Sequence, residues 1–453
     1  MSALPQAPAF CAVPSGTALP RAPQAPAATG LPETFLVELV AKAMFEYGLT
    51  RLTELTQHLA LSGAVIDAVC QFMRREGLIE VTRRGQTEAD VQYELSGAGS
   101  ARAIEWLTRN RYAGPAPVTL EAYTRVVQAQ AITQRRVTVQ QVRTAFADLV
   151  IPDGLADLLG TAVNSGRPLL LYGPPGAGKT YLAGHLQRLL TGPVAIPYAI
   201  AVHGEVIRVF DEHWHHPAAA RETGPAQLDN AARPDPRWVL CERPLVVSGG
   251  ELTLQMLDLA FDERAGYYEA PPHFKANNGL FIVDDLGRQV VTPRELMNRW
   301  IVPMDRREDY LMLRSGGKFK IPFDMVLVFC SNLRPSELED MAFLRRIGHK
   351  VHVGPLAVGE YREIFKRVCV AEGIAFDEAS FQGLLRDYHA TRGQPLLACY
   401  PRDLLQLIAS RAAYLGVTPQ LSPALIDWAW NVYFAAAEED TPPPGMTPLT
   451  QME

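Results

Sequence analysis

One lysine of this chain lies in a glycine-rich stretch whose spacing suits the binding of phosphate groups. Residues 168–180 read PLLLYGPPGAGKT, and Gly173, Gly178, Lys179 and Thr180 complete the pattern Gly-x-x-x-x-Gly-Lys-Thr. An apolar run precedes the pattern and a helical pattern follows it, which is the strand–loop–helix context that the motif requires. Glycines let backbone N–H groups converge on phosphate oxygens, and the following helix adds partial positive charge. The sequence therefore predicts a loop that binds the phosphates of a nucleotide.

The residue types in this loop have separate expected roles. We expect Lys179 to reach the β- and γ-phosphates of ATP, and the Thr180 hydroxyl to ligate Mg²⁺. The residues expected to surround the phosphates are Gly173, Pro174, Pro175, Gly176, Ala177, Gly178, Lys179, Thr180 and Tyr181. The alternative, a glycine-rich turn with a lysine by chance, does not account for the flanking strand and helix.

Two adjacent acids end a second apolar run. Residues 280–285 read LFIVDD, so four apolar residues lead into Asp284 and Asp285. A continuous apolar run fits a central strand of a parallel sheet, and the carboxyl ends of such strands form the ligand-binding edge. We expect Asp284 to hold Mg²⁺, mostly through water, and Asp285 to polarise the attacking water. The alternative is an ordinary strand that ends in a turn.

Composition and charge limit the class of protein. The chain has 453 residues, 48% hydrophobic and 20% charged, with a formal net charge of −6, which fits a folded protein of roughly three domains. So mild a charge argues against binding of polyanions by bulk charge. Six cysteines without a Cys-x-x-Cys pair, no signal-like N-terminus and no apolar run of bilayer length predict a cytoplasmic protein without a membrane partner.

The first third of the chain divides into three segments. Residues 1–30 are rich in Pro and Ala and predict a flexible leader. Residues 31–112 carry three helical patterns, a hairpin pattern and a fourth helical pattern, an order that resembles a winged-helix domain. This segment holds nine basic and eleven acidic residues, which favours docking to protein over contact with DNA. Residues 113–140 predict a linker.

The rest of the chain has a different pattern of apolar residues. From 141 to 354 short apolar runs alternate with helical stretches, which is typical of a parallel α/β sheet. Residues 355–436 show helical patterns only, and 437–453 predict a flexible tail. Surplus sequence around 203–243 includes a group of aromatic side chains: His203, His213, His215, His216, Trp214 and Trp238. Because these histidines lack an established ligand spacing, we expect a surface loop and no metal.

With these motifs in place, residues 141–436 resemble the AAA+ ATPases. Three further segments occur in the order that this family uses. They are MVLVFCSN with Asn332 as sensor 1, MAFLRRI with Arg345 and Arg346 as arginine-finger candidates, and YPRDLL with Arg402 as sensor 2. The phrases ANNGLFIVDD and PRELMNRWIVPMDRRED also resemble the MoxR-like and helix-2-insert groups of that family.

This resemblance implies an architecture and an activity. It implies an α/β fold, a three-layer αβα P-loop core with a C-terminal helical lid, and ATP and Mg²⁺ bound between the two. Asn332 would sense the γ-phosphate and Arg402 would couple it to the lid. An arginine finger from a neighbouring subunit implies a ring homo-oligomer, typically a hexamer, that remodels or activates an unknown protein client. The alternative for Arg345 and Arg346 is a solvated basic turn.

One departure from the family pattern bears on the rate of hydrolysis. The family usually ends its second strand in Asp-Glu, whereas this chain has Asp284-Asp285. An aspartate carboxylate retreats by about 1.5 Å relative to glutamate, and a displacement of about 1 Å can cost about 10²-fold in rate. We therefore expect slow turnover. The alternatives are an ATP-dependent conformational switch or DNA-bound regulator with little hydrolysis, and a small-molecule kinase, which would not need the lid and arginine pattern.

Overall fold

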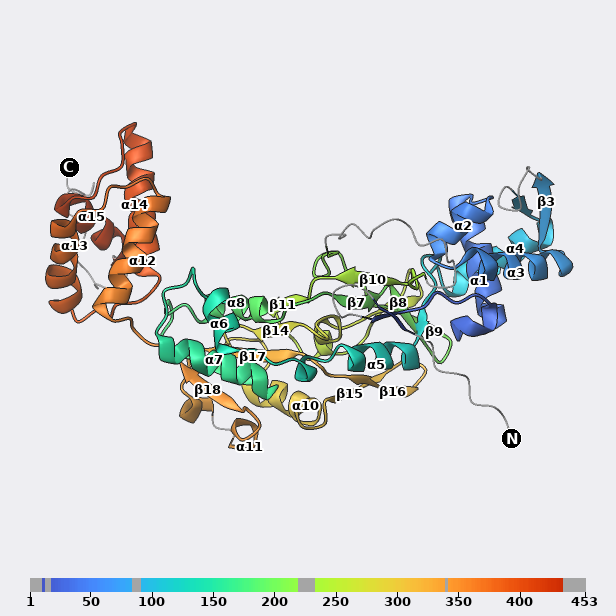
Figure 1. Cartoon of the computed structure of the whole chain (residues 1–453), viewed down its shortest axis with the longest axis horizontal. Helices are drawn as coiled ribbons and strands as arrows, with labels where there is room; N and C mark the ends of the chain where they lie inside the picture. Colours follow the sequence, from blue (N-terminus) through green and yellow to red (C-terminus); the bar gives the residue numbers. More distant parts are fainter. Residues whose placement is uncertain (1–9, 13–17, 84–90, 219–232, 339–340, 435–453) are drawn as a thin grey trace, which may run out of the picture.

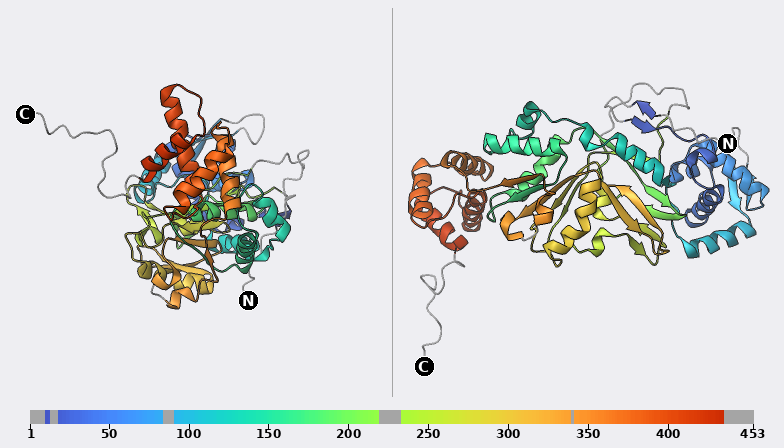
Figure 2. Two further views of the ribbon diagram at one scale, coloured as in Figure 1. Left: turned by 90° about the vertical axis from the view of Figure 1, so that its left-hand side faces the viewer. Right: turned by 90° about the horizontal axis from the view of Figure 1, so that it is seen from below.

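The computed structural model describes residues 10–12, 18–83, 91–218, 233–338 and 341–434. The molecule is elongated, with a helical C-terminal part at one end and an α+β N-terminal part at the other (Figure 1). The view from below shows the same order of parts (Figure 2). Among the described residues, no helix combines the length and the apolar character needed to span a membrane.

A five-stranded parallel sheet forms the centre of the nucleotide core, in the order β11-β14-β17-β6-β18. Its strands are β6 (Leu169–Tyr172), β11 (Leu245–Ser248), β14 (Leu280–Val283), β17 (Val326–Ser331) and β18 (His349–His352). Residues of β14 and β17 are buried throughout because both faces of the sheet are covered. This explains why these strands read as continuous apolar runs in the sequence.

Two apolar clusters, one on each face, make this core a three-layer αβα fold. Leu169, Ile282 and Val328 pack with helices on one face, whereas Phe281 and Phe329 pack with helices on the other. The first face carries α6 (Val139–Ala145), α7 (Asp153–Ser165), α8 (Lys179–His185) and η4 (Leu186–Leu189). The second carries α10 (Pro293–Arg306), η6 (Gln255–Leu257), η7 (Pro335–Leu338) and α11 (Met341–Leu344). The predicted α/β P-loop core is confirmed.

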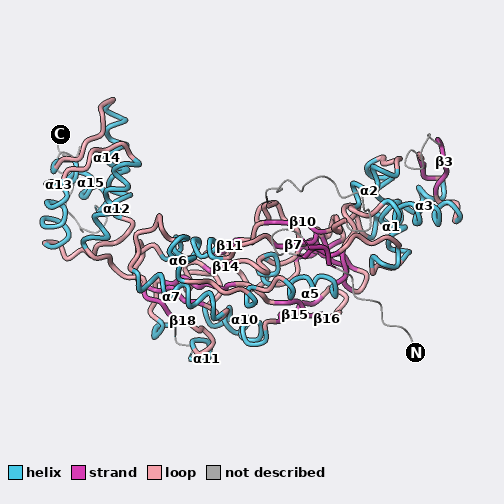
Figure 3. The backbone as a smooth tube through the Cα atoms, in the orientation of Figure 1, coloured by secondary structure: helices cyan, strands magenta, loops and turns pink. Residues whose placement is uncertain are grey.

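The C-terminal region is a helical lid. It comprises α12 (Val358–Ala371), α13 (Glu378–Gly383), the π-helix η8 (Leu384–Ala390), α14 (Tyr400–Leu415) and α15 (Pro423–Phe434). Phe365, Phe381 and Trp430 are fully buried between these helices. Figure 3 shows only helix and loop in this part of the chain.

A second sheet, which we call the insertion sheet, lies between the core and the N-terminal domain, in the order β12-β13-β9-β8-β5. Its strands are β5 (Val118–Thr119), β8 (Ala199–Val202), β9 (Glu205–Arg208), β12 (Ala260–Asp262) and β13 (Tyr267–Glu269). Beside it lie two antiparallel pairs, β7 (Val194–Pro197) with β10 (Trp238–Cys241) and β15 (Glu308–Met312) with β16 (Lys318–Pro322), and the short helix α9 (Pro272–Lys275). The surplus is therefore folded β structure, and the predicted surface loop at 203–243 is wrong for its described part.

The N-terminal domain contains three helices, a hairpin and a fourth helix. The elements are α1 (Glu33–Tyr47), α2 (Leu52–Leu59), α3 (Gly63–Arg75), β3 (Ile79–Arg83), β4 (Gln92–Leu95) and α4 (Gly97–Arg109). Ser62 caps α3 and Ser96 caps α4, each accepting a hydrogen bond from a backbone N–H in the first turn. The order of elements is the one read from the sequence, and the winged-helix interpretation stays a prediction.

The flexible leader predicted for residues 1–30 is wrong for its second half. Residues 18–31, which we call the strap, contain β2 (Ala18–Pro20), paired with β1 (Phe10–Ala12), and the 3₁₀ helix η1 (Pro26–Thr29). Backbone bonds of 2.8 Å from Asp235 N to Pro20 O and of 3.0 Å from Ala22 N to Arg233 O tie the strap to the chain before β10. Pro and Ala content alone does not reveal such pairing, because the partner lies about 200 residues away in the sequence.

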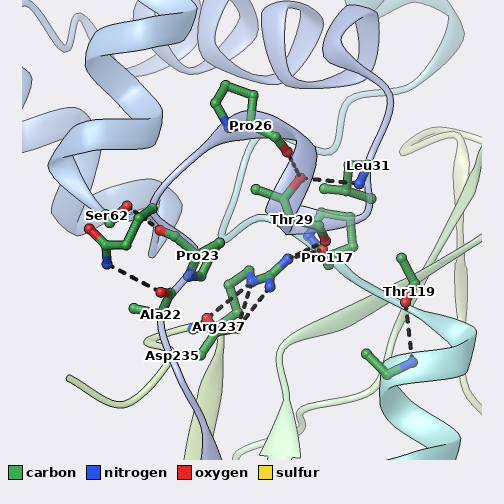
Figure 4. Close-up of polar contacts among 12 residues, drawn as sticks. Ala22, Pro23, Pro26, Thr29, Leu31, Ser62, Pro117, Thr119, Asp235 and Arg237 are labelled. Atoms are coloured by element: carbon green, nitrogen blue, oxygen red, sulfur yellow. Dashed lines mark hydrogen bonds and ion pairs between the residues drawn. The ribbon is translucent and has the colours of Figure 1, made fainter. Parts of the chain in front are cut away.

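A buried arginine holds the strap in place (Figure 4). Arg237 is 5% exposed and forms a 2.7 Å ion pair with Asp235, which is 2% exposed. The same guanidinium donates hydrogen bonds to Thr29 O at 3.1 Å and Pro117 O at 3.3 Å. At the far side of the strap, the Ser62 hydroxyl donates to Pro23 O. The strap thus joins the insertion to the N-terminal domain.

The linker predicted for residues 113–140 is also wrong. This segment supplies β5 of the insertion sheet, then α5 (Leu120–Ala129) and the 3₁₀ helix η3 (Ile132–Gln134). Gln130 donates a 2.9 Å hydrogen bond to the buried Asn278 side chain, and Asp324 accepts one of 2.9 Å from Ile132 N. Buried polar contacts of this kind fix the segment to the loops that enter β14 and β17.

Candidate nucleotide-binding site

The phosphate loop connects β6 to α8, as the motif requires. Gly173, Gly176 and Gly178 all have positive φ, at 150°, 80° and 91°. A Cβ atom added at Gly173 would lie 2.0 Å from the Val353 carbonyl oxygen, and one at Gly176 would lie 2.5 Å from Cys399 Sγ. Glycine is therefore required here for the backbone conformation and for close approach to β18 and to the lid.

Lys179 is 7% exposed, and its ammonium group forms three hydrogen bonds to the protein. Its Nζ donates to Gly173 O at 3.0 Å, to Pro174 O at 2.9 Å and to Asn332 Oδ1 at 2.8 Å. Burial lowers the pKa of Lys179, against which Asp285 and Asp284 act in the opposite direction. The positive charge that we expect to bind the phosphates, that of Lys179, thus lies directly at the loop.

Thr180 and Asp284 meet although 104 positions separate them. The Thr180 hydroxyl donates a 2.7 Å hydrogen bond to Asp284 Oδ1. A hydroxyl and a carboxylate oxygen are ligands of the hard type that Mg²⁺ takes, with water and phosphate oxygens filling its other positions. The residues present therefore fit a magnesium ion held jointly with a nucleotide.

Asp285 and Asn332 complete the site from the two neighbouring strands β14 and β17. The Asn332 amide donates a 3.1 Å hydrogen bond from Nδ2 to Asp285 Oδ1, while its Oδ1 accepts from Lys179. Asp285 N also donates to Asp284 Oδ1 at 3.0 Å. A continuous set of hydrogen bonds thus links the five residues that the sequence placed at the phosphates, the metal and the attacking water.

The order of strands around this site decides the fold assignment. The phosphate loop follows β6, the acid pair follows β14 and the polar Asn332 follows β17, all at the carboxyl edge of one parallel sheet. The helical lid follows β18 and contacts the phosphate loop through a 3.1 Å bond from Cys399 N to Gly176 O. This arrangement is that of a P-loop α/β fold followed by a helical lid.

Solved structures with similarity to this chain are distant in sequence. RuvB of Thermotoga maritima, described as a Holliday junction branch migration motor, is 14% identical, with 65% of this chain and 73% of that chain covered and a TM-score of 0.36. NtrX of Brucella abortus, solved in complex with ADP, is 12% identical, with 60% and 52% covered and a TM-score of 0.38. The fold assignment rests on the strand order and loop geometry of this chain.

Two further comparisons concern sequence alone. A family described as Domain of unknown function (DUF8689) matches residues 357–432, which are the helices of the lid. No curated protein matches the chain.

The candidate arginines lie outside the hydrogen-bonded network. Arg402 is in the first turn of α14, near the lid contact with the phosphate loop. Its side chain is nevertheless 65% exposed, and its Nε lies 3.6 Å from Asp403 Oδ1. Arg346 forms a 2.7 Å ion pair with Asp305, whereas Arg345 is exposed. The structure therefore does not bring these arginines to the phosphate loop of the same chain.

One histidine of the insertion, His215, has a structural role, whereas His203, His213 and His216 are exposed. His215 is fully buried, accepts a 2.9 Å hydrogen bond from Asp211 N at Nδ1, and contacts Lys275 O through Nε2 at 2.8 Å. Burial lowers the pKa of His215 to about 4, so the ring is neutral and Nε2 donates. The 341–434 segment and the other described ranges hold no group of three or more His, Cys, Asp or Glu side chains suited to a metal.

Two residues near the site were not predicted from the sequence. Gln289 donates a 2.7 Å hydrogen bond to Asp284 O and one of 3.4 Å to Gly249 O, which ties the loop after β14 to the loop after β11. Cys399 forms the lid contact with Gly176. Neither belongs to a motif, and only the three-dimensional neighbourhood of strands and lid reveals them.

Proposed function

We propose that this chain is an ATPase that binds Mg-ATP at the carboxyl edge of its central sheet and hydrolyses it slowly. What supports the proposal is the meeting of Lys179, Thr180, Asp284, Asp285 and Asn332 in one hydrogen-bonded network. Lys179 neutralises the β- and γ-phosphates, and Thr180 and Asp284 hold the metal. Asp285 polarises the water, and Asn332 orients it beside the γ-phosphate.

The binding step has a direct test. Isothermal titration of the full chain with Mg-ATP should give saturable binding that Lys179→Ala abolishes, because the ammonium charge opposite the phosphates is lost. Lys318→Ala, at an exposed lysine of β16, should bind as the parent does. Parental affinity in Lys179→Ala would refute the site.

Hydrolysis is tested separately by phosphate release. We expect measurable release that Asp285→Asn removes while ATP affinity stays. The second candidate function is an ATP-dependent conformational switch or DNA-bound regulator with little hydrolysis, and the observation that favours it is Asp285 in place of the longer glutamate. Equal and negligible release from the parent and from Asp285→Asn, with binding intact, would favour the switch.

We propose further that the ATPase works as a ring homo-oligomer, typically a hexamer, in the cytoplasm. Arg345 is the better arginine-finger candidate because it is exposed, whereas Arg346 is already paired with Asp305. A finger contributes about 10³–10⁵-fold to turnover, so Arg345→Ala should lose turnover and keep ATP affinity. Full activity at a concentration where mass photometry shows only monomers would contradict the ring.

The work done is remodelling or activation of a macromolecular partner. The N-terminal domain is proposed as its docking part, with a protein client favoured over DNA because the domain has slightly more acids than bases. Pull-down with Asp285→Asn loaded with ATP should retain the client. A gel shift of the full chain at low salt tests DNA, and a shift lost at about 200 mM salt would indicate phosphate contact.

A further inference from the structure

The backbone at Asp285 has an unusual conformation for a residue with a side chain. Its φ is +49°, in the left-handed region, and only a few other non-glycine residues of the described chain share this sign. In that region Asp and Asn are several-fold enriched, since their short polar side chains bond locally, whereas most other residues with a side chain are uncommon. The residue type at 285 is therefore tied to its backbone conformation.

The left-handed residue delays the next contact of the chain with β17 by one position. Asp284 N donates to Ser248 O of β11 at 2.8 Å, so a regular strand would direct the next N–H, that of Asp285, toward β17. Instead Asp285 N donates to Asp284 Oδ1 at 3.0 Å, and Leu286 N takes the β17 position by donating to Cys330 O at 2.7 Å. One residue is thus inserted into the hydrogen-bond alternation, as in a β-bulge.

Contacts on both sides hold this turn in place. The Ser331 hydroxyl donates a 2.8 Å hydrogen bond to Leu286 O, and the Leu286 side chain is 1% exposed. Arg288 N donates to Asp285 O at 2.9 Å. The segment after β14 therefore lies against the end of β17, and β17 is the strand that pairs with β6 and its phosphate loop.

We propose that this left-handed turn places the Asp285 carboxylate to polarise the water that attacks the γ-phosphate of ATP, and that it makes aspartate, rather than the longer glutamate, the fitting residue at this position. At this turn Leu286 N makes the hydrogen bond to β17, and Asp285 Oδ1 accepts from Asn332 Nδ2 at 3.1 Å. The backbone thereby makes up part of the length that the aspartate side chain lacks relative to glutamate. The inference rests on the proposed ATPase function for its catalytic part and on the backbone alone for its structural part.

Three substitutions at one position, combined with calorimetric melting and phosphate release, test this. Asp285→Asn keeps a residue that tolerates the turn, so melting should match the parent while hydrolysis is lost. Asp285→Gly removes the strain, so melting should be at least parental, again without hydrolysis. Asp285→Glu should melt about 2–4 °C lower and hydrolyse no faster than the parent.

Asp258→Glu is the matched control, because Asp258 is exposed and has an ordinary φ of −110°. It should melt and hydrolyse as the parent does. A glutamate variant at 285 with parental melting and at least 10-fold faster hydrolysis would overturn the inference, since the short side chain would then be a defect. A glycine variant that melts below the parent would overturn the turn itself.

The proposed hydrolysis and the proposed effect of the left-handed turn can be refuted independently. If the parent binds ATP but releases no phosphate, the proposed hydrolysis is wrong. The melting order of the glycine, asparagine and glutamate variants then still decides whether the left-handed turn selects the residue. If the melting order is as expected and the glutamate variant is faster than the parent, the turn is real but does not position the carboxylate.

Discussion

The lid and the N-terminal domain each share an apolar cluster with the centre of the molecule, but they differ in whether they touch the phosphate loop. The lid begins after β18 and touches the phosphate loop itself, through the Cys399 N to Gly176 O bond of 3.1 Å. The N-terminal domain shares an apolar cluster with the insertion sheet, in which Tyr112 packs beside Ala199 and Val206. Its strap is fastened by the buried Arg237.

This difference indicates whether the lid or the N-terminal domain responds to nucleotide binding. A ligand in the phosphate loop meets the lid contact directly, so its binding energy can favour one lid position over another. The contacts of the N-terminal domain are buried and lie outside the phosphate site. We therefore expect the N-terminal domain, strap and insertion to move as one body, and the lid to move relative to the core.

The largest expected effect comes from breaking the fastening of the strap. Arg237→Met leaves the Asp235 carboxylate, 2% exposed, without its cation and removes the donors to Thr29 O and Pro117 O. Loss of one partner of a buried pair typically costs about 3–5 kcal/mol. Limited proteolysis should then cut the strap and the segment around 113–117, while titration shows ATP binding unchanged.

The matched control for this variant is Arg102→Met. Arg102 forms an exposed pair with Glu105, with side chains 60% and 56% exposed, and such pairs contribute about 0–1 kcal/mol. Its proteolysis pattern should equal that of the parent. Equal resistance of Arg237→Met and Arg102→Met would show that the N-terminal domain does not depend on the strap.

A second expected effect is acid sensitivity at the base of the insertion. Burial lowers the pKa of His215 to about 4 from an ordinary value near 6.5. Between these two pH values, the ring is protonated in the unfolded state and neutral in the folded state. Stability from this group is complete above pH 6.5 and falls as pH drops toward 4, by about 3 kcal/mol in all. Denaturant unfolding of the parent and of His215→Gln between pH 7.5 and 4.5 measures the difference.

The lid provides the internal comparison for this pH effect. His389 is also buried, contacts the Tyr361 hydroxyl at 3.1 Å through Nε2, and has its pKa lowered by burial. If the lid and the insertion unfold separately, the free energy of unfolding of each should fall in acid. In His215→Gln, only the unfolding of the insertion should lose its dependence on pH. An unchanged slope in that variant would mean that folding does not lower the pKa of His215.

The sequence predicted the core because its signals are local. The apolar run 280–283 and the glycine pattern 173–180 each lie in one short segment, and parallel-sheet geometry then requires their ends to meet. The strap and the 113–140 segment were predicted wrongly for the opposite reason. Their partners, such as Arg237 and Asn278, are distant in sequence, and composition does not encode pairing over that distance.

The candidate site shows the same limit. Lys179, Thr180 and Asp284 were predictable because a motif carries each of them. The contact of Cys399 with Gly176 and the positive φ of Asp285 were not, since each depends on which element passes the loop at a few ångströms. The arginines stay predictions, because a finger acts on a neighbouring subunit and the order of motifs is all that points to it.

The smallest expected effect tests the lid contact directly. Gly176→Ala forces a left-handed alanine at φ +80°, which costs about 1–2 kcal/mol, and sets Cβ 2.5 Å from Cys399 Sγ. We expect ATP affinity to fall about 10-fold by titration, since about 1.4 kcal/mol corresponds to that factor. Adding Cys399→Ala should recover only the part due to the clash, because the backbone cost stays.

Gly184→Ala separates this contact from a general effect of substituting glycine near the loop. A Cβ at Gly184, within α8, meets no atom within 4 Å, and alanine favours a helix by about 1 kcal/mol over glycine. Its ATP affinity should match the parent or exceed it slightly. If Gly176→Ala also binds ATP as the parent does, the lid contact does not take part in nucleotide binding. The distinction between a lid that senses the phosphate loop and an N-terminal domain that does not would then fail.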